Sequence, residues 1–281
     1  MCRFQSSIAR YCRYRAGLAR SRWVGLLDSL FDPQATKFYS ELVANGFHQV
    51  SNIDVLPQQR ILYLPIPKCA STTIRMALSA MIGEFPPCAL QVHLRRRSAL
   101  RSPKQVGASA FHRLVQDQTA LRFSFVRNPY DRLVSAWADK FQGKPLAPGD
   151  AYVDVYLRRR RAMGLALPKN ADGTLSFADF VHFVAATADD PVDGHWRPQS
   201  DLLDLPGVSF DFIGRLETFG RDFARVIAHA GADPTLVASA NGHLNKSRHH
   251  AWRDYYTGAL ADQVYRTFER DFDRLQYSRA V

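Results

Sequence analysis

Residues 60–82, RILYLPIPKCASTTIRMALSAMI, form the stretch that decides the fold. Arg60 to Ile66 is a short apolar run that ends at Pro67, and such a run predicts a buried strand. From Thr72 to Ile82 the apolar residues recur at helical spacing, which predicts an amphipathic helix after a turn. A strand that leads through a turn into a helix is typical of an α/β fold.

The turn itself, residues 67–73 (PKCASTT), has the composition of an anion site. The first backbone N–H groups of a helix lack intrahelical partners and point outward with the positive end of the helix dipole, which favours a phosphate. Ser71, Thr72 and Thr73 can add hydroxyl donors. Lys68 can neutralise charge on an oxygen that bridges a phosphate to a transferred group. Taken alone, however, such a turn is explained equally well as a capped helix.

A second segment repeats this pattern. Residues 121–126 (LRFSFV) are strand-like, Arg127, Asn128 and Pro129 turn the chain, and residues 130–141 carry apolar residues on one helical face. Arg127 then stands at a strand end and Ser135 two turns into the helix, so both can converge on one anion. An arginine offers a planar donor fork to phosphate oxygens, and a serine hydroxyl adds a further donor. The sequence therefore predicts a second phosphate site.

The rest of the chain reads as a continuation of one α/β unit without repeats or low-complexity tracts. Residues 143–172 mix Pro, Gly and arginines, which predicts a surface excursion with some helix. Ser176 and Asp179 predict a capping box at the start of a helix. Residues 210–216 read as another strand, and residues 258–275 read as a closing helix.

Composition limits the partners and the compartment. The 281 residues carry a formal net charge of +11, so the average surface field favours anionic partners such as nucleotides, acidic glycans, nucleic acid or anionic membrane. No apolar run is long enough to span a bilayer. The cysteines show no CxxC pairing, which disfavours a structural zinc site or a disulfide scaffold and fits a reducing compartment; they are Cys2, Cys12, Cys69 and Cys88.

The two turns resemble the 5′-phosphosulfate-binding and 3′-phosphate-binding motifs of sulfotransferases that use 3′-phosphoadenosine 5′-phosphosulfate (PAPS). FVRNPYDRLVSAW, residues 125–137, is the more specific of the two. HWRPQ (195–199) and FIGRLE (212–217) resemble stretches of the carbohydrate sulfotransferase branch, also described as sulfotransferase family 2-like. Residues 245–272 are similar to its closing segment, so the resemblance extends over residues 58–277.

This resemblance implies a single P-loop-like α/β domain with a central parallel sheet flanked by helices, and it implies no metal requirement. We expect a basic N-terminal arm with helices, partly packed on the core, at residues 1–57. The sulfotransferase domain is expected at residues 58–281.

The resemblance also implies roles for the two turns. Lys68 would assist departure of the phosphate leaving group, and Arg127 and Ser135 would hold the 3′-phosphate that distinguishes PAPS from nucleotides without it. Ala70 stands where the family frequently has glycine, so the backbone can approach the phosphosulfate less closely. The expected donor-binding residues are Lys68, Cys69, Ala70, Ser71, Thr72, Thr73, Arg127, Ser135, Lys246 and Ser247.

An acceptor hydroxyl needs a general base, because its pKa lies far above neutrality. His112, between the two phosphate motifs, is the first candidate and His195 the second, while His93 and Glu84 remain alternatives. Each histidine could instead be a structural or surface residue. Next to His195, Trp196 could stack on a sugar, or it could be a buried anchor.

The expected function is therefore transfer of a sulfuryl group from PAPS to a hydroxyl of a carbohydrate or glycolipid by in-line displacement, with release of the bisphosphate PAP. The arginines at 95–97 and 158–161 could bind an anionic acceptor, or they could be solvated faces. We expect no nucleic acid partner. The alternatives are a P-loop-type nucleotide kinase, which would need paired acids for its metal, and a non-catalytic module that binds polyanions.

The N-terminus bears on the location of the protein. No acidic residue precedes Asp28, and the first 27 residues are rich in arginine but lack the apolar core of a secretory signal. We therefore expect a cytoplasmic enzyme, with peripheral membrane contact through the basic N-terminus left open.

Overall fold

The computed structural model describes residues 32–86, 88–94, 98–165, 173–188, 193–237 and 250–281. Residues 1–31 of the expected basic arm (1–57) and the donor-binding candidates Lys246 and Ser247 lie outside these ranges. The chain forms two compact units that interleave along the sequence. Within the described residues, unit 1 draws on residues 32–65, 70–125 and 204–237, and unit 2 on residues 66–69, 126–203 and 250–281.

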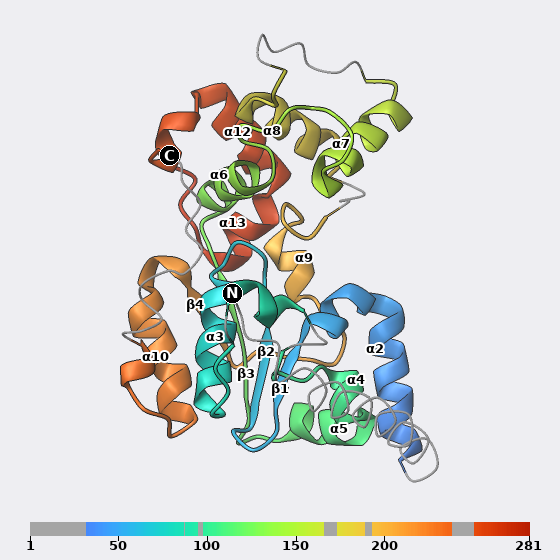
Figure 1. Cartoon of the computed structure of the whole chain (residues 1–281), viewed down its shortest axis with the longest axis vertical. Helices are drawn as coiled ribbons and strands as arrows, with labels where there is room; N and C mark the ends of the chain where they lie inside the picture. The colour runs from blue at the N-terminus through green and yellow to red at the C-terminus, as the bar shows by residue number, and fades with distance from the viewer. Residues whose placement is uncertain (1–31, 87, 95–97, 166–172, 189–192, 238–249) are drawn as a thin grey trace, which may run out of the picture. The chain divides into compact units, whose positions relative to one another are not determined.

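Unit 1 contains a four-stranded sheet in the order β1-β2-β3-β4 (Figure 1). β2 and β3 pair in parallel, with Ile61 opposite Leu121, whereas β1 pairs antiparallel with β2. The predicted α/β class is confirmed, but the sheet is mixed rather than parallel, because β1 reaches β2 through a tight connection that reverses the chain. The strands are β1 (Asp54–Leu56), β2 (Ile61–Leu64), β3 (Leu121–Val126) and β4 (Phe212–Arg215).

Helices flank this sheet. α2 and α5 pack against β2, and α10 packs against β4. Gly214 in β4 lies so close to the Phe125 ring that a Cβ would sit 2.6 Å from it, so glycine is required for this contact. Among its described residues, unit 1 includes the helices α2 (Pro33–Asn52), α3 (Ser71–Met81), η2 (Ala89–His93), α4 (Pro103–Val106), α5 (Ala108–Gln116), η3 (Leu216–Thr218) and α10 (Phe219–His229).

Unit 2 is a cluster of helices (Figure 1). Its core is rich in aromatic side chains. α6 packs on α8, α12 and η4, and Trp137 contacts the rings of Phe177 and Tyr255. Trp196 is buried against Phe180, so it is a core anchor and not a platform for a sugar. Its helices are α6 (Pro129–Lys140), α7 (Ala151–Ala162), α8 (Phe177–Ala186), α9 (Gln199–Leu203), η4 (Trp252–Tyr255), α12 (Gly258–Thr267) and α13 (Glu269–Leu275).

The predicted closing helix is wrong in one respect, because it is two helices separated at Phe268. Phe268 has φ −116° and ψ 22°, which ends α12 and begins α13. The buried Asp271 on α13 accepts hydrogen bonds from the backbone N–H groups of Gln199 and Ser200 at the start of α9. Just after the break, Asp271 therefore accepts hydrogen bonds from the first N–H groups of α9, which have no partner within that helix.

Candidate functional site

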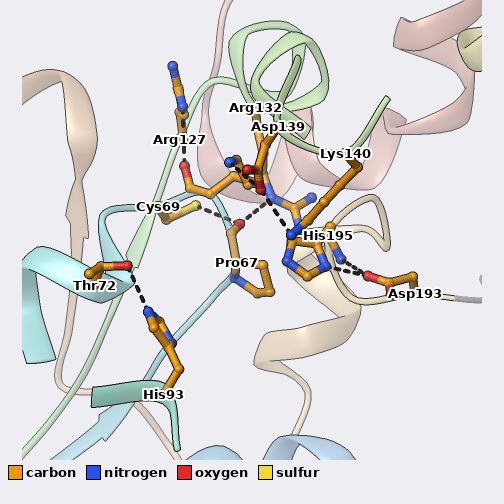
Figure 2. Close-up of polar contacts among 11 residues, drawn as sticks. Pro67, Cys69, Thr72, His93, Arg127, Arg132, Asp139, Lys140, Asp193 and His195 are labelled. Atoms are coloured by element: carbon orange, nitrogen blue, oxygen red, sulfur yellow. Dashed lines mark hydrogen bonds and ion pairs between the residues drawn. The ribbon is translucent and has the colours of Figure 1, made fainter. Parts of the chain in front are cut away.

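Lys68 and Arg127, the two predicted phosphate-binding cations, both lie in unit 2 and are joined directly. The Arg127 guanidinium donates from Nη1 to the Lys68 carbonyl oxygen at 3.3 Å (Figure 2). Arg127 also forms a bidentate pair with Asp131, at 2.8 and 2.7 Å. Of the five N–H donors of an arginine, these contacts with described residues use three. Two N–H donors of Arg127 therefore remain for a ligand.

One face of α6 carries the partners of both cations. Asp131, Ser135 and Asp139 follow one another at intervals of four residues, which places them along one side of the helix. Asp131 pairs with Arg127 and Asp139 pairs with Lys68, so the buried Ser135 lies between the two ion pairs on this face. The structure thereby brings Lys68, Arg127 and Ser135 to one region.

Asp139 also bridges Lys68 to a third cation. Its Oδ2 lies 3.1 Å from Lys68 Nζ and 3.0 Å from Lys140 Nζ. Burial would raise the pKa of Asp139, but the charges of the two lysines outweigh this effect and lower it. Burial lowers the pKa of Lys68, whose side chain is 12% exposed, although Asp139 opposes the shift. Sequence reasoning missed Asp139 and Lys140, although the spacing from Asp131 was a readable signal.

A buried arginine fixes the loop that precedes Lys68. Arg132 donates to the carbonyl oxygen of Pro67 at 3.1 Å (Figure 2). It also donates to the carbonyl oxygens of Arg197 at 2.8 Å and Gly194 at 2.7 Å. Buried carbonyl groups need such donors, and a charged donor forms the stronger kind of hydrogen bond. Arg132 therefore ties the Lys68 loop to the segment that carries His195.

His195 is the second histidine candidate, and it lies close to the lysines of this region. Its Nδ1 pairs with Asp193 Oδ1 at 2.5 Å (Figure 2). The ring of His195 also meets Tyr152 edge-on. An ionised carboxylate only accepts, so Nδ1 carries the hydrogen and Nε2 has its lone pair. Among the described residues, Nε2 of His195 has no hydrogen-bond partner. Burial lowers the pKa of His195, with Asp193 opposing and Lys140 and Lys68 reinforcing the shift.

The hydroxyl residues predicted to bind phosphate begin α3 in unit 1. Ala70, the residue before the helix, adopts a left-handed conformation with φ 59° and makes no side-chain cap. Lys68 also has a positive φ, of 69°. Thr72 and Thr73 are buried, and Ser71 is partly exposed. The start of α3 is therefore a helix N-terminus without a side-chain cap.

His93, an alternative base, belongs to a hydrogen-bond chain in unit 1. Its Nε2 lies 2.7 Å from Thr72 Oγ1 (Figure 2). Its Nδ1 lies 3.2 Å from Arg75 Nη1. Arg75 is held in turn by the buried Asp54 at 2.7 Å. Because an arginine only donates, Nδ1 must accept and Nε2 must carry the hydrogen that Thr72 accepts. Both ring nitrogens are engaged, which fits an orienting role better than that of a base.

The other histidine candidate, His112, is on α5 in unit 1. Its Nε2 lies 3.0 Å from Gln116 Nε2, and its ring packs on Phe38 of α2 at 4.7 Å between centroids. Glu84 is exposed in the segment after α3. The role of His112 as a base stays a prediction, as do the phosphate contacts of Cys69 and Ala70.

No group of three or more His, Cys, Asp or Glu side chains that could hold a metal occurs in the described part of the chain. Searching the same residues finds no helix that combines the length and the apolar character needed to cross a membrane. The expectation that no metal takes part stays a prediction.

Comparison with known proteins identifies the family. The model of the Sulfotransferase family matches residues 51–278, and the chain belongs to this family. Carbohydrate sulfotransferase 14 of Danio rerio is 28% identical over 189 residues, which cover 65% of this chain and 49% of that protein. Carbohydrate sulfotransferase 11 of Rattus norvegicus is 25% identical over 82% of this chain and 68% of its own length. Carbohydrate sulfotransferase 8 of Homo sapiens is 26% identical over 98% of this chain and 68% of its own. The chain thus spans about half the length of the first of these relatives.

Proposed function

We propose that this protein transfers a sulfuryl group from PAPS to a hydroxyl of a carbohydrate or glycolipid and releases PAP. The observation that carries the proposal is the convergence of Lys68 and Arg127 along one face of α6. Membership in the Sulfotransferase family and the names of the carbohydrate sulfotransferases similar to this chain support the same reaction.

Arg127 and Ser135 would bind the 3′-phosphate of the donor. Arg127 has two N–H donors left after its contacts with Asp131 and Lys68, and this number suits two phosphate oxygens. Ser135 lies on the same face of α6, one helical turn beyond Asp131. Selectivity for a nucleotide with a 3′-phosphate would follow from these contacts.

Lys68 would act on the leaving group. When the sulfur–oxygen bond to the 5′-phosphate breaks, negative charge builds up on the departing oxygen, and an ammonium group in a partly buried site stabilises that charge. Directly along the chain from Lys68, the uncapped N-terminus of α3 and its hydroxyls at 71–73 favour binding of the 5′ end.

His195 is the general base that the geometry supports best. The acceptor oxygen attacks sulfur, the acceptor O–H proton moves to Nε2 of His195, and the electron pair of the breaking bond leaves with PAP. Asp193 holds the ring in the required tautomer and stabilises the imidazolium that forms. The lowered pKa of His195 keeps its ring neutral near pH 7, so it is able to accept the proton.

Surface charge bears on the acceptor. Arg158 and Arg161 on α7 are exposed, and Tyr152 in the first turn of the same helix contacts His195. Cations on this helix support an acidic carbohydrate as acceptor. We also propose that the protein acts in the cytoplasm, because its cysteine content suits a reducing compartment.

The test is transfer of label from [³⁵S]PAPS to a panel of desulfated glycosaminoglycans, neutral oligosaccharides, glycolipids and phenols. We expect label on a carbohydrate, no transfer from adenosine 5′-phosphosulfate, and loss of transfer in Lys68→Met. PAP should also raise the melting temperature of the protein, because a ligand that binds only the native state stabilises it. A protein that neither transfers label nor binds PAP would refute the proposed function.

A further inference from the structure

The buried side-chain amide of Gln199 forms hydrogen bonds with both main-chain polar groups of Arg127, its N–H and its carbonyl. The Arg127 N–H donates to Oε1 of Gln199 at 2.9 Å, and Nε2 of Gln199 donates to the Arg127 carbonyl at 2.8 Å. A side-chain amide thus takes the place that a neighbouring strand would have at the end of β3. These two bonds hold the main chain of Arg127 at this strand end.

The same amide reaches the other phosphate-binding loop. Oε1 of Gln199 accepts a hydrogen bond from Cys69 Sγ at 3.3 Å, and Cys69 is the residue next to Lys68. Gln199 therefore touches the residue that would hold the 3′-phosphate and the neighbour of the lysine that would act on the leaving group.

Asp271 fixes the amide in this orientation. Its carboxylate accepts from the Gln199 backbone N–H at 2.8 Å and from Nε2 at 3.3 Å. The two hydrogens of Nε2 go to the Arg127 carbonyl and Asp271, and the two lone pairs of Oε1 go to Arg127 N–H and Cys69. All four bonding positions are used, and the flipped amide would set a donor against the Arg127 N–H.

From these contacts we propose that Gln199 is a positioning residue that sets the separation of Arg127 and Lys68 for the donor nucleotide. The inference rests on the proposed function and adds to it a residue that does not touch the nucleotide. Its consequence is specific, because displacement of Arg127 should reduce the preference for PAP over AMP, which lacks the 3′-phosphate. A residue that only stabilised the fold would leave this preference unchanged.

Gln199→Glu tests the proposal with almost no change of shape. The substitution replaces the donating Nε2 group with a carboxylate oxygen, which faces the Arg127 carbonyl and Asp271 and can only accept. We expect the affinity for PAP at pH 7.5 to fall at least tenfold, while the affinity for AMP changes little. Isothermal titration calorimetry with each nucleotide measures the two affinities and thus their ratio.

Acidification adds a second readout. We expect burial and the adjacent Asp271 to raise the pKa of an introduced glutamate by more than the nearby cations Arg127 and Arg132 lower it. When the new carboxyl is protonated it can donate a hydrogen bond again, so the ratio of the affinities for PAP and AMP should return toward the wild-type ratio as the pH falls from 7.5 to 5.5. The same measurements on the wild type correct for protonation of the nucleotide phosphate groups, which have a pKa of about 6. Gln118→Glu, at an exposed position, is the matched control for the added charge.

The outcomes separate the two proposals. If the wild type does not bind PAP, the proposed function fails; if it binds PAP and folded Gln199→Glu keeps the wild-type ratio, the positioning role fails. Should Gln199→Glu not fold, Gln199→Met removes the bonds without adding a charge, and an unchanged PAP to AMP ratio in that variant overturns the inference.

Discussion

Replacement of Arg127 by alanine tests the donor site most directly. Three of the five guanidinium N–H groups bond to Asp131 and Lys68, which leaves two for the 3′-phosphate of the proposed donor. A hydrogen bond to a charged group contributes about 1.5–3 kcal/mol, so two such bonds contribute at least about 3 kcal/mol. Since about 1.4 kcal/mol corresponds to a factor of ten, Arg127→Ala should weaken PAP binding by at least ~100-fold.

The loss should exceed this lower bound, because the substitution also leaves Asp131 without its cation and close to the phosphate. Calorimetry with PAP and with AMP isolates the contribution of the 3′-phosphate, because the lost contact and the repulsion from Asp131 both act on this group and both lower the ratio of the two affinities. Arg127→Lys serves as the matched control: it retains the charge but loses the donor fork, so its affinity for PAP should be intermediate. If Arg127→Ala remains folded and prefers PAP over AMP as strongly as the wild type does, Arg127 does not bind the 3′-phosphate.

Three further predictions concern the base and the donor loop. Because burial lowers the pKa of His195, kcat/KM of the wild type should stay level down to a pH below the ordinary histidine pKa of about 6.5 and fall in more acidic solution. Asp193→Asn removes a partner that raises the pKa of His195, so the acidic limb of the pH profile should shift to lower pH. His195→Ala should reduce turnover by on the order of 10²-fold with PAP binding intact, whereas the same loss in His112→Ala, with His195→Ala active, would assign the base to His112. Ala70→Gly should raise the free energy of unfolding by up to about 1 kcal/mol in urea titrations, because glycine adopts the left-handed conformation of this residue without strain. The control Ala224→Gly, within the helix α10, should lower the free energy of unfolding by about 1 kcal/mol, because glycine is a poor helix former.

The elements that carry the two cations could be predicted from the sequence because their signals are local. The apolar run before Pro67 became β2, and the run at 121–126 became β3 with the predicted bounds. The helices after both turns, α3 and α6, begin within one residue of their predicted starts. Short apolar runs, turn residues and helical spacing are properties of a few neighbouring residues, so tertiary contacts are not needed to read them.

The partners of the cations were harder to predict because most of them are distant in sequence. Gln199 and Asp271 are 72 residues apart, and nothing near either residue indicates that they meet. Asp131 and Asp139 were within reach, because their spacing with Ser135 places all three on one face of α6. The pairing of Asp193 with His195 also had a weak local signal, an acid two residues before a histidine.

The acids explain how a cluster of cations stays ordered before an anionic ligand binds. Lys68, Lys140 and Arg127 contribute three positive charges, and Asp131 and Asp139 contribute two negative ones, so these five side chains carry a net charge of +1. Unpaired, partly buried cations would be costly, and each carboxylate removes part of that cost while leaving N–H donors available. A nucleotide with two phosphate groups brings more negative charge than this excess neutralises. We therefore expect its affinity to depend on directed hydrogen bonds from Arg127, and for this reason the position of Arg127 should matter more than its charge alone.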